Sequence, residues 1–151
     1  MGISLESKST VRQMMEAQRF AVLATIHNEQ PYSNLVAFAA SNDLKTILFA
    51  TNSNTQKYRN ILINRNVALL IDNRDDRHLG PGEALAITAL GTATEKTLDM
   101  SDTVVQSYLT RHPSLEDFLH REDTAVFFIE VTDYILARFD ETERIRVDST
   151  L

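Results

Sequence analysis

Short apolar runs joined by short polar connections are the feature that most constrains how this chain can fold. The runs at 20–26, 32–40 and 46–51 have the length and the β-branched and aromatic content of strands. The connections between them, HNEQP and SNDLK, are too short for a helical crossover. Strands joined in this way pair antiparallel, so the sequence predicts a mainly β fold.

The remaining elements extend this sheet and cover it. Four stretches have helical spacing of apolar residues or a helix-like composition: 9–18, 56–64, 100–113 and 114–122. Three have strand patterns: 67–72, 83–95 and 124–139, the last as two segments around Thr132 and Asp133. We expect one α+β domain over residues 1–151, with a six- or seven-stranded antiparallel sheet curled into a barrel and flanked by helices.

Charge and cysteine content limit the partners. A net charge of −6 argues against non-specific nucleic-acid binding, because lysine and arginine supply most of that affinity. The absence of cysteine excludes disulfides, cysteine-ligated metals and a thiol nucleophile, and gives no support for secretion. No run of about 18 apolar residues occurs. We therefore expect a cytoplasmic protein that engages neither nucleic acid nor a membrane.

Several familiar sites cannot be written with this sequence. Its four glycines allow neither a dinucleotide fingerprint nor a P-loop, and no G-x-S-x-G elbow is present. The four histidines lack metal-ligand spacing and stand among polar residues: His27, His78, His112 and His120. We expect all four to be solvated and expect no metal site.

The stretch TNSNTQK, residues 51–57, is the best candidate for a ligand site. It leads from a strand into a helix, whose first turn presents unpaired N–H groups and the positive end of the helix dipole. Thr55, Gln56 and Lys57 add a hydroxyl, an amide and a positive charge, which together could hold a phosphate. The alternative is that Asn54 and Thr55 only cap the helix while Lys57 and Arg59 face water.

A second polar pair, Ser33 and Asn34, interrupts an otherwise apolar strand. A hairpin could bring this pair near the strand at 46–51. The two polar groups together suggest a flat ligand along the sheet with its phosphate at the helix. In isolation, a serine and an asparagine in a strand are ordinary surface residues.

Residues 20–72 resemble the flavin-binding split-barrel family related to pyridoxamine 5′-phosphate oxidase. The resemblance rests on the LAT ending of the first strand, the P-x-S-x-x-x-F second strand, the LFAT third strand and the K-x-R-N-I helix followed by VALL. The later strands fit more loosely.

The resemblance implies a six-stranded Greek-key split barrel and a homodimer that binds one FMN at each of two sites across its interface. Carried over by position, the residues expected at the cofactor are Ser33, Asn34, Leu35 and Val36 beside the ring and ribityl chain, Ala50 and Thr51 against the cofactor, and Thr55, Gln56 and Lys57 at its phosphate.

This chain departs from the family pattern at two positions. Many relatives place arginine where it has Gln56, and the oxidase itself has a basic residue where it has Asn34. It also lacks the oxidase's C-terminal substrate motif, so we do not expect true pyridoxamine 5′-phosphate oxidase activity.

The expected function is a flavin-dependent oxidoreductase acting on an unknown small molecule, with a reduced nicotinamide as electron donor. We expect no catalytic side chain, because the flavin carries the redox chemistry. The alternative is a non-catalytic module that binds flavin, haem or a deazaflavin.

The expected dimer and substrate pocket involve other parts of the chain. The apolar residues expected to exceed the needs of the barrel interior, and so to contribute to the interface, are Leu85, Ile87, Phe127, Phe128 and Ile129. We expect the loop at 73–83 and the helices at 100–123 to line the substrate pocket.

Overall fold

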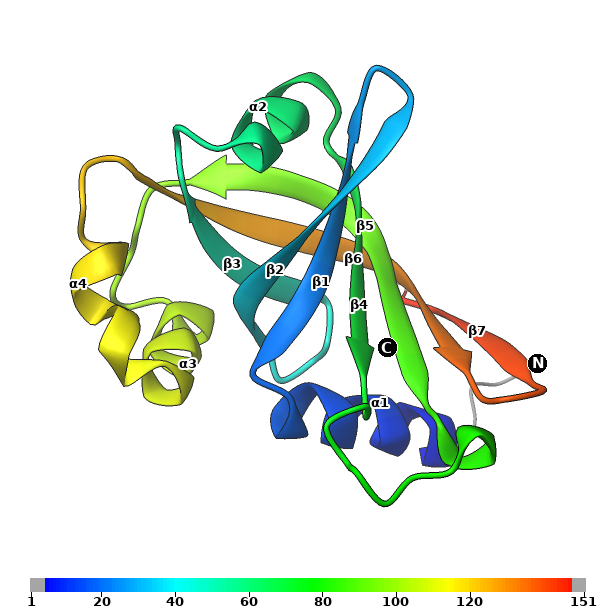
Figure 1. Cartoon of the computed structure of the whole chain (residues 1–151). Coiled ribbons are helices and arrows are strands. Elements are labelled where there is room, and N and C mark those ends of the chain that lie inside the picture. Colours follow the sequence, from blue (N-terminus) through cyan, green and yellow to red (C-terminus); the bar gives the residue numbers. More distant parts are fainter. Residues whose placement is uncertain (1–4, 148–151) are drawn as a thin grey trace.

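The computed structural model describes residues 5–147, so both ends of the expected domain lie outside the described residues. Its seven strands form one antiparallel sheet in the order β3-β2-β1-β4-β5-β6-β7, and β3 also pairs with β6 (Figure 1). This extra pairing closes the first six strands into a barrel. The spatial order 3-2-1-4 is that of a Greek key. The predicted barrel is therefore confirmed.

Apart from β7, which the sequence analysis did not predict, the strands and α-helices lie close to their predicted positions. The strands are β1 Phe20–His27, β2 Gln30–Ala40, β3 Thr46–Asn52, β4 Asn66–Asp72, β5 Ala86–Lys96, β6 Thr124–Ala137 and β7 Thr142–Arg146. The α-helices are α1 Leu5–Ala17, α2 Gln56–Ile63, α3 Thr103–Arg111 and α4 Glu116–Leu119, with 3₁₀ turns at Pro81–Glu83 and Pro113–Leu115.

The first hairpin is tighter than its sequence indicates. Asn28 and Glu29 have φ angles of 48° and 67°, so they alone form the turn, and Gln30 pairs with His27. Pro31 therefore lies inside β2 rather than in the connection. This position suits proline because the β2 edge away from β1 has no strand beside it at this point.

The C-terminal strands differ from the prediction. Thr132 and Asp133 do not separate two strands. They lie within the continuous strand β6. The pairing of β6 with β5 shifts register between Leu90 and Gly91, so that Thr132 has no partner residue in β5. A Cβ at Gly91 would lie 2.1 Å from the carbonyl oxygen of Glu130, which explains the glycine at this point.

Two apolar clusters hold the fold together. The larger fills the barrel, where Phe49 stacks on Phe127 with ring centroids 5.2 Å apart. The smaller lies between α3, α4 and the outer face of β2, β3 and β6. Ile87, Phe127 and Ile129 are at most 1% exposed and belong to the barrel interior. The expectation that these three residues exceed the needs of the interior was therefore wrong.

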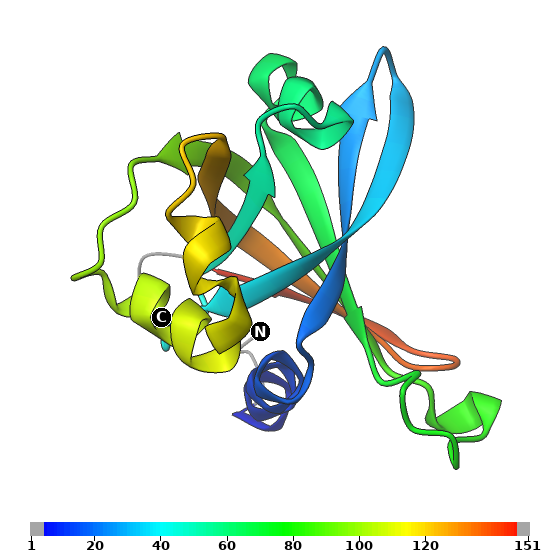
Figure 2. The same ribbon diagram turned by 60° about the vertical axis from the view of Figure 1, so that its left-hand side comes forward.

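The helices are distributed around the barrel. In Figures 1 and 2, α2 lies at the same end of the barrel as the β1–β2 turn, α1 lies at the other end, and α3 and α4 lie against one side. No helix in the described part of the chain is both long and apolar enough to cross a membrane. The end of the barrel that carries α2 is where the candidate site forms.

Candidate cofactor site

The site begins where β2 and β3 part. These strands pair at only three positions, between Phe38–Ala40 and Ile47–Phe49. From Ala37 back to Gln30, β2 pairs with β1 alone, while β3 continues along β6 to Asn52. Two strand edges without a sheet partner therefore face the same opening. Such edges present main-chain donors and acceptors that a polar ligand can use.

A network of hydrogen bonds fixes the turn from β3 into α2. Thr55 is the N-cap, because its Oγ1 accepts from the N–H of Tyr58 at 3.4 Å. The same oxygen lies 3.1 Å from Oγ1 of the buried Thr51. Asn52 donates to Asp123 at 2.8 Å, and this bond lowers the pKa of the carboxyl group. The turn is therefore fixed before any ligand binds.

Lys57 lies on the side of α2 that faces the barrel. It precedes the two buried residues of the helix, Asn60 and Ile61, by three and four positions, which places all three on one face. Desolvation lowers the pKa of its ammonium group. No hydrogen bond or ion pair within residues 5–147 involves this group. The capping role predicted for Thr55 is thus confirmed, but Lys57 is half-buried rather than fully solvated.

Asn34 has a buried polar atom without a partner. Its side chain lies on the same side of β2 as the buried Val36 and Phe38, which face the barrel interior. The Oδ1 atom is buried and accepts no hydrogen bond in the described structure. A buried acceptor without a partner costs about 1–3 kcal/mol, so an Asn at this position calls for an explanation.

The other residues that were expected at the cofactor lie on different faces of the sheet. Ser33 and the 66%-exposed Leu35 point outward, whereas Val36 is buried. Ala50 lies on the outer face, beside the cluster that α3 and α4 cover. The structure thus brings Thr51, Thr55, Gln56 and Lys57 together at α2. It places Ser33 to Val36 on β2, on the other side of the opening between β2 and β3.

The sequence analysis did not predict that Thr25, Arg59 and Asn60 would belong to the framework of the site. Asn60 donates to Oγ1 of Thr25 at 3.0 Å and so ties α2 to β1. Arg59 donates to the carbonyl oxygen of Asn54 at 3.3 Å. The spacing of Asn60 three residues after Lys57 was an available signal, because it places a polar side chain on the buried face of the helix.

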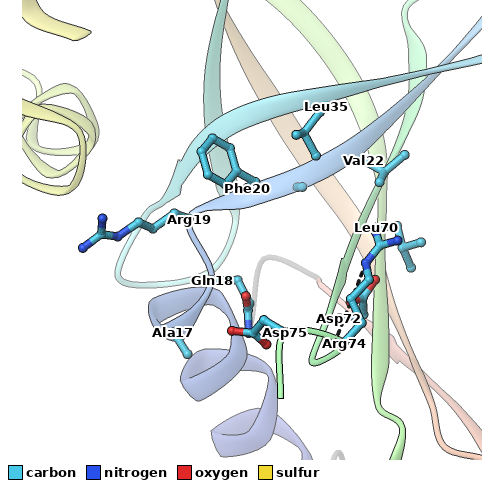
Figure 3. A pocket seen from close by; sticks show the side chains of 11 residues that line it. Ala17, Gln18, Arg19, Phe20, Val22, Leu35, Leu70, Asp72, Arg74 and Asp75 are labelled. Atoms are coloured by element: carbon cyan, nitrogen blue, oxygen red, sulfur yellow. Dashed lines mark hydrogen bonds and ion pairs between the residues drawn. The ribbon is translucent and has the colours of Figure 1, made fainter. Parts of the chain in front are cut away.

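A cavity of about 610 Å³ lies on the outer face of the sheet, toward the opposite end of β1 (Figure 3). Its apolar floor includes Val22, with Leu35 and Leu70 as its direct cross-strand neighbours. Phe20, which is 58% exposed, also lines it. The rim is charged, and Arg74 contacts Asp72 at 3.0 Å. Leu35 connects this cavity to the β2 stretch of the candidate site.

One histidine prediction was wrong. His112 is 7% exposed, and its Nε2 lies 2.9 Å from the carbonyl oxygen of Phe38. Burial lowers the pKa of the imidazole, and Arg111 and Arg19 act in the same direction. His27, His78 and His120 are exposed, as expected. His112 therefore fastens the end of α3 to β2, at the residue where β2 and β3 part.

The closed barrel, the parted strands and the capped helix beside them define a split-barrel protein with a candidate cofactor site. A family model described as pyridoxamine 5′-phosphate oxidase matches residues 7–133. The chain belongs to this family. No curated protein matches the sequence.

Solved structures share the fold at low sequence identity. General stress protein 26 from Bacillus anthracis is 20% identical, with a TM-score of 0.70, and the match covers 95% of this chain and 100% of that one. A haem-binding protein from Mycobacterium smegmatis is 12% identical, with a TM-score of 0.81 over 96% of this chain, which spans 60% of that protein. HutZ, the haem storage protein of Vibrio cholerae, is 14% identical, with a TM-score of 0.71 and 95% of each chain covered. At these identities the likeness establishes the fold alone.

Proposed function

We propose that this protein binds FMN at the parting of β2 and β3 and acts as a flavin-dependent oxidoreductase on a small molecule. The observation that carries the proposal is the pair of unsatisfied polar groups at the α2 end of the barrel. Asn34 has a buried acceptor without a donor, and Lys57 has a half-buried cation without an anion. A ligand that carries both hydrogen-bond donors and an anionic group would satisfy both residues.

FMN has the required groups. Its ring N–H and ribityl hydroxyls can donate to Oδ1 of Asn34, and its phosphate can accept from Lys57 and the first-turn N–H groups of α2. When bound, the flavin supplies the electron or hydride transfer. The protein's part is to hold the phosphate at the prepared turn and to align the ring along the open strand edges.

The same proposal includes a homodimer. The row formed by Val22, Leu35 and Leu70 leaves apolar surface on the outside of the barrel, and Phe20 extends it. A second copy of the chain covering this face would remove that surface from water and close the candidate site from outside. Sedimentation of the flavin-loaded protein at micromolar concentration should give a dimer. A monomer with flavin bound would contradict this part of the proposal.

Haem binding is the second candidate function. It is supported by the shared fold with the haem-binding protein of Mycobacterium smegmatis and with HutZ. The orphan acceptor of Asn34 favours flavin over haem, because the ionised propionates of haem offer no donor to it. A deazaflavin has a ring N–H, hydroxyls and a phosphate like those of FMN, so competition with FMN is the measurement that separates those two.

The absorption spectrum of the purified protein tests the choice directly. Reconstitution with FMN should give flavin bands that remain with the protein through gel filtration. A Soret band that persists after the same treatment with haem, without flavin retention, would favour the second candidate. Retention of neither ligand would overturn both. Turnover with reduced nicotinamides and a panel of small acceptors then tests the oxidoreductase activity.

A further inference from the structure

The side chain of Gln56 is bonded to its neighbours on the helix. Its Nε2 donates to Oδ1 of Asn60 at 2.7 Å and lies 3.5 Å from Nδ1 of His27. A glutamine amide carries two hydrogens, and the bond to Asn60 uses one of them. Its Oε1 accepts from Arg59 at 3.2 Å. Gln56 therefore faces its neighbours, although its position at the start of the helix suggested a direct phosphate contact.

Arg59 reaches back to the start of α2. One of its terminal nitrogens donates to Oε1 of Gln56 and the other to the carbonyl oxygen of Asn54, which precedes the helix. The guanidinium group thus lies beside the first turn, although its Cα belongs to the second. This direction agrees with the tilt of helical side chains toward the N-terminus. None of the ion pairs among the described residues involves Arg59, so no carboxylate neutralises its charge.

Arg59 and Lys57 flank the first turn from opposite sides. Two positions along a helix correspond to a rotation of about 200°. Lys57 lies on the barrel side with the buried Asn60, while Arg59 lies on the solvent side with the exposed Leu62 and Ile63. The end of the helix between these cations is also where the phosphate of the proposed ligand would lie.

We propose that Arg59 is the second cation of the phosphate site and that Gln56 is the positioning residue that holds its guanidinium group in place. This proposal rests on the proposed function, in which FMN is the ligand. A phosphate monoester carries a charge of about −1.5 to −2 near pH 7, which Lys57 alone cannot balance. The pair of cations would make the site selective for the phosphorylated flavin over riboflavin.

Titration of FMN and riboflavin into the full chain tests the role of Arg59. Arg59→Gln should weaken FMN binding about tenfold, because it removes a charge-assisted hydrogen bond. Riboflavin affinity should stay within about twofold, since riboflavin lacks the phosphate. Arg77→Gln is the matched control, because it removes the same charge from an exposed loop residue. It should leave both affinities unchanged.

A second pair of variants tests the positioning role of Gln56. Gln56→Ala should weaken FMN binding by a smaller factor than Arg59→Gln, because the guanidinium group remains but loses an acceptor. The double variant Gln56→Arg with Arg59→Gln should recover most of the lost FMN affinity, since a guanidinium group then projects from the first helical residue. A purely structural role for Arg59 would not be rescued in this way. Thermal unfolding of each variant identifies any loss of folding.

The outcomes separate this proposal from the proposed function. If Lys57→Ala weakens FMN binding while Arg59→Gln does not, the role of Arg59 is refuted and the FMN site stands. Failure of the double variant to bind FMN better than Arg59→Gln, with both variants folded, also contradicts the proposal. If the parent protein binds neither flavin, the proposed function fails and this proposal fails with it.

Discussion

Asn60 donates a hydrogen bond from its Nδ2 to Oγ1 of Thr25 over 3.0 Å, and both residues are at most 1% exposed. This bond joins α2 to β1 across the end of the barrel. Because Asn60 also accepts from Gln56, the bond fixes the rotation of the helix that presents Lys57. The geometry of the candidate site therefore depends on a contact that a ligand need not touch.

Thr25→Val should destabilise the protein by about 1–3 kcal/mol, because it leaves the buried Nδ2 of Asn60 without its acceptor. The free energy of urea unfolding measures this loss. In the double variant with Asn60→Leu, both polar groups are gone, so the cost should be less than the sum of the two single losses. Strictly additive losses would show that the two side chains do not interact.

Asn34→Leu should stabilise the ligand-free protein by about 1 kcal/mol, because it removes a buried acceptor that has no partner. The same variant should weaken FMN and riboflavin binding by similar factors, since both flavins carry the ring N–H and the ribityl hydroxyls. Urea unfolding measures the change in stability, and flavin titration measures the change in affinity. A lower stability of Asn34→Leu together with unchanged flavin affinity would show that Asn34 has a structural role.

Gly91→Ala tests the account of the sheet irregularity. A Cβ at this position would lie 2.1 Å from the Glu130 carbonyl oxygen, so the strands must shift, at a cost of about 1–3 kcal/mol. Gly82→Ala is the control, because a Cβ there meets nothing within 4 Å. It should change stability by no more than about 0.5 kcal/mol. Equal stabilities of the two variants would contradict the close approach at Gly91.

The stability of the protein should fall as the pH drops below the usual histidine pKa of 6.5, partly because of His112. Burial lowers the pKa of this imidazole in the folded state, so the unfolded chain takes up its proton first. The loss grows from about pH 6.5 down to the folded pKa and is complete below it. In His112→Gln, unfolding measured across this range should depend less steeply on pH. An unchanged slope would show that His112 does not contribute.

Local patterns in the sequence predicted the strands and the helix cap because both depend on residues close together in the chain. The apolar runs at 20–26 and 32–40, joined by the short polar connection HNEQP, indicated the first hairpin. Thr55 was identified as a cap from its place before the helix. Each of these features depends on a few neighbouring residues, and the structure confirms both the hairpin and the cap.

Contacts between distant residues could not be read in the same way. Thr25 looks like an ordinary strand residue, and only the packing of α2 on β1 makes it the acceptor for Asn60. The β7 segment was missed because its sequence, TERIR, has a single apolar residue, Ile145. The burial of His112 depends on the carbonyl group of Phe38, 74 residues away. Each of these features follows from tertiary pairing.

The binding of FMN and of riboflavin to the parent protein and to Lys57→Ala tests the central claim most directly. If Lys57 pairs with the phosphate, its loss should cost roughly 1.5–3 kcal/mol, about a ten- to hundredfold drop in FMN affinity. Riboflavin should bind the two proteins almost equally. A parent protein that does not bind FMN, or an FMN affinity unchanged in Lys57→Ala, would contradict the account and leave residues 51–57 as an ordinary helix cap.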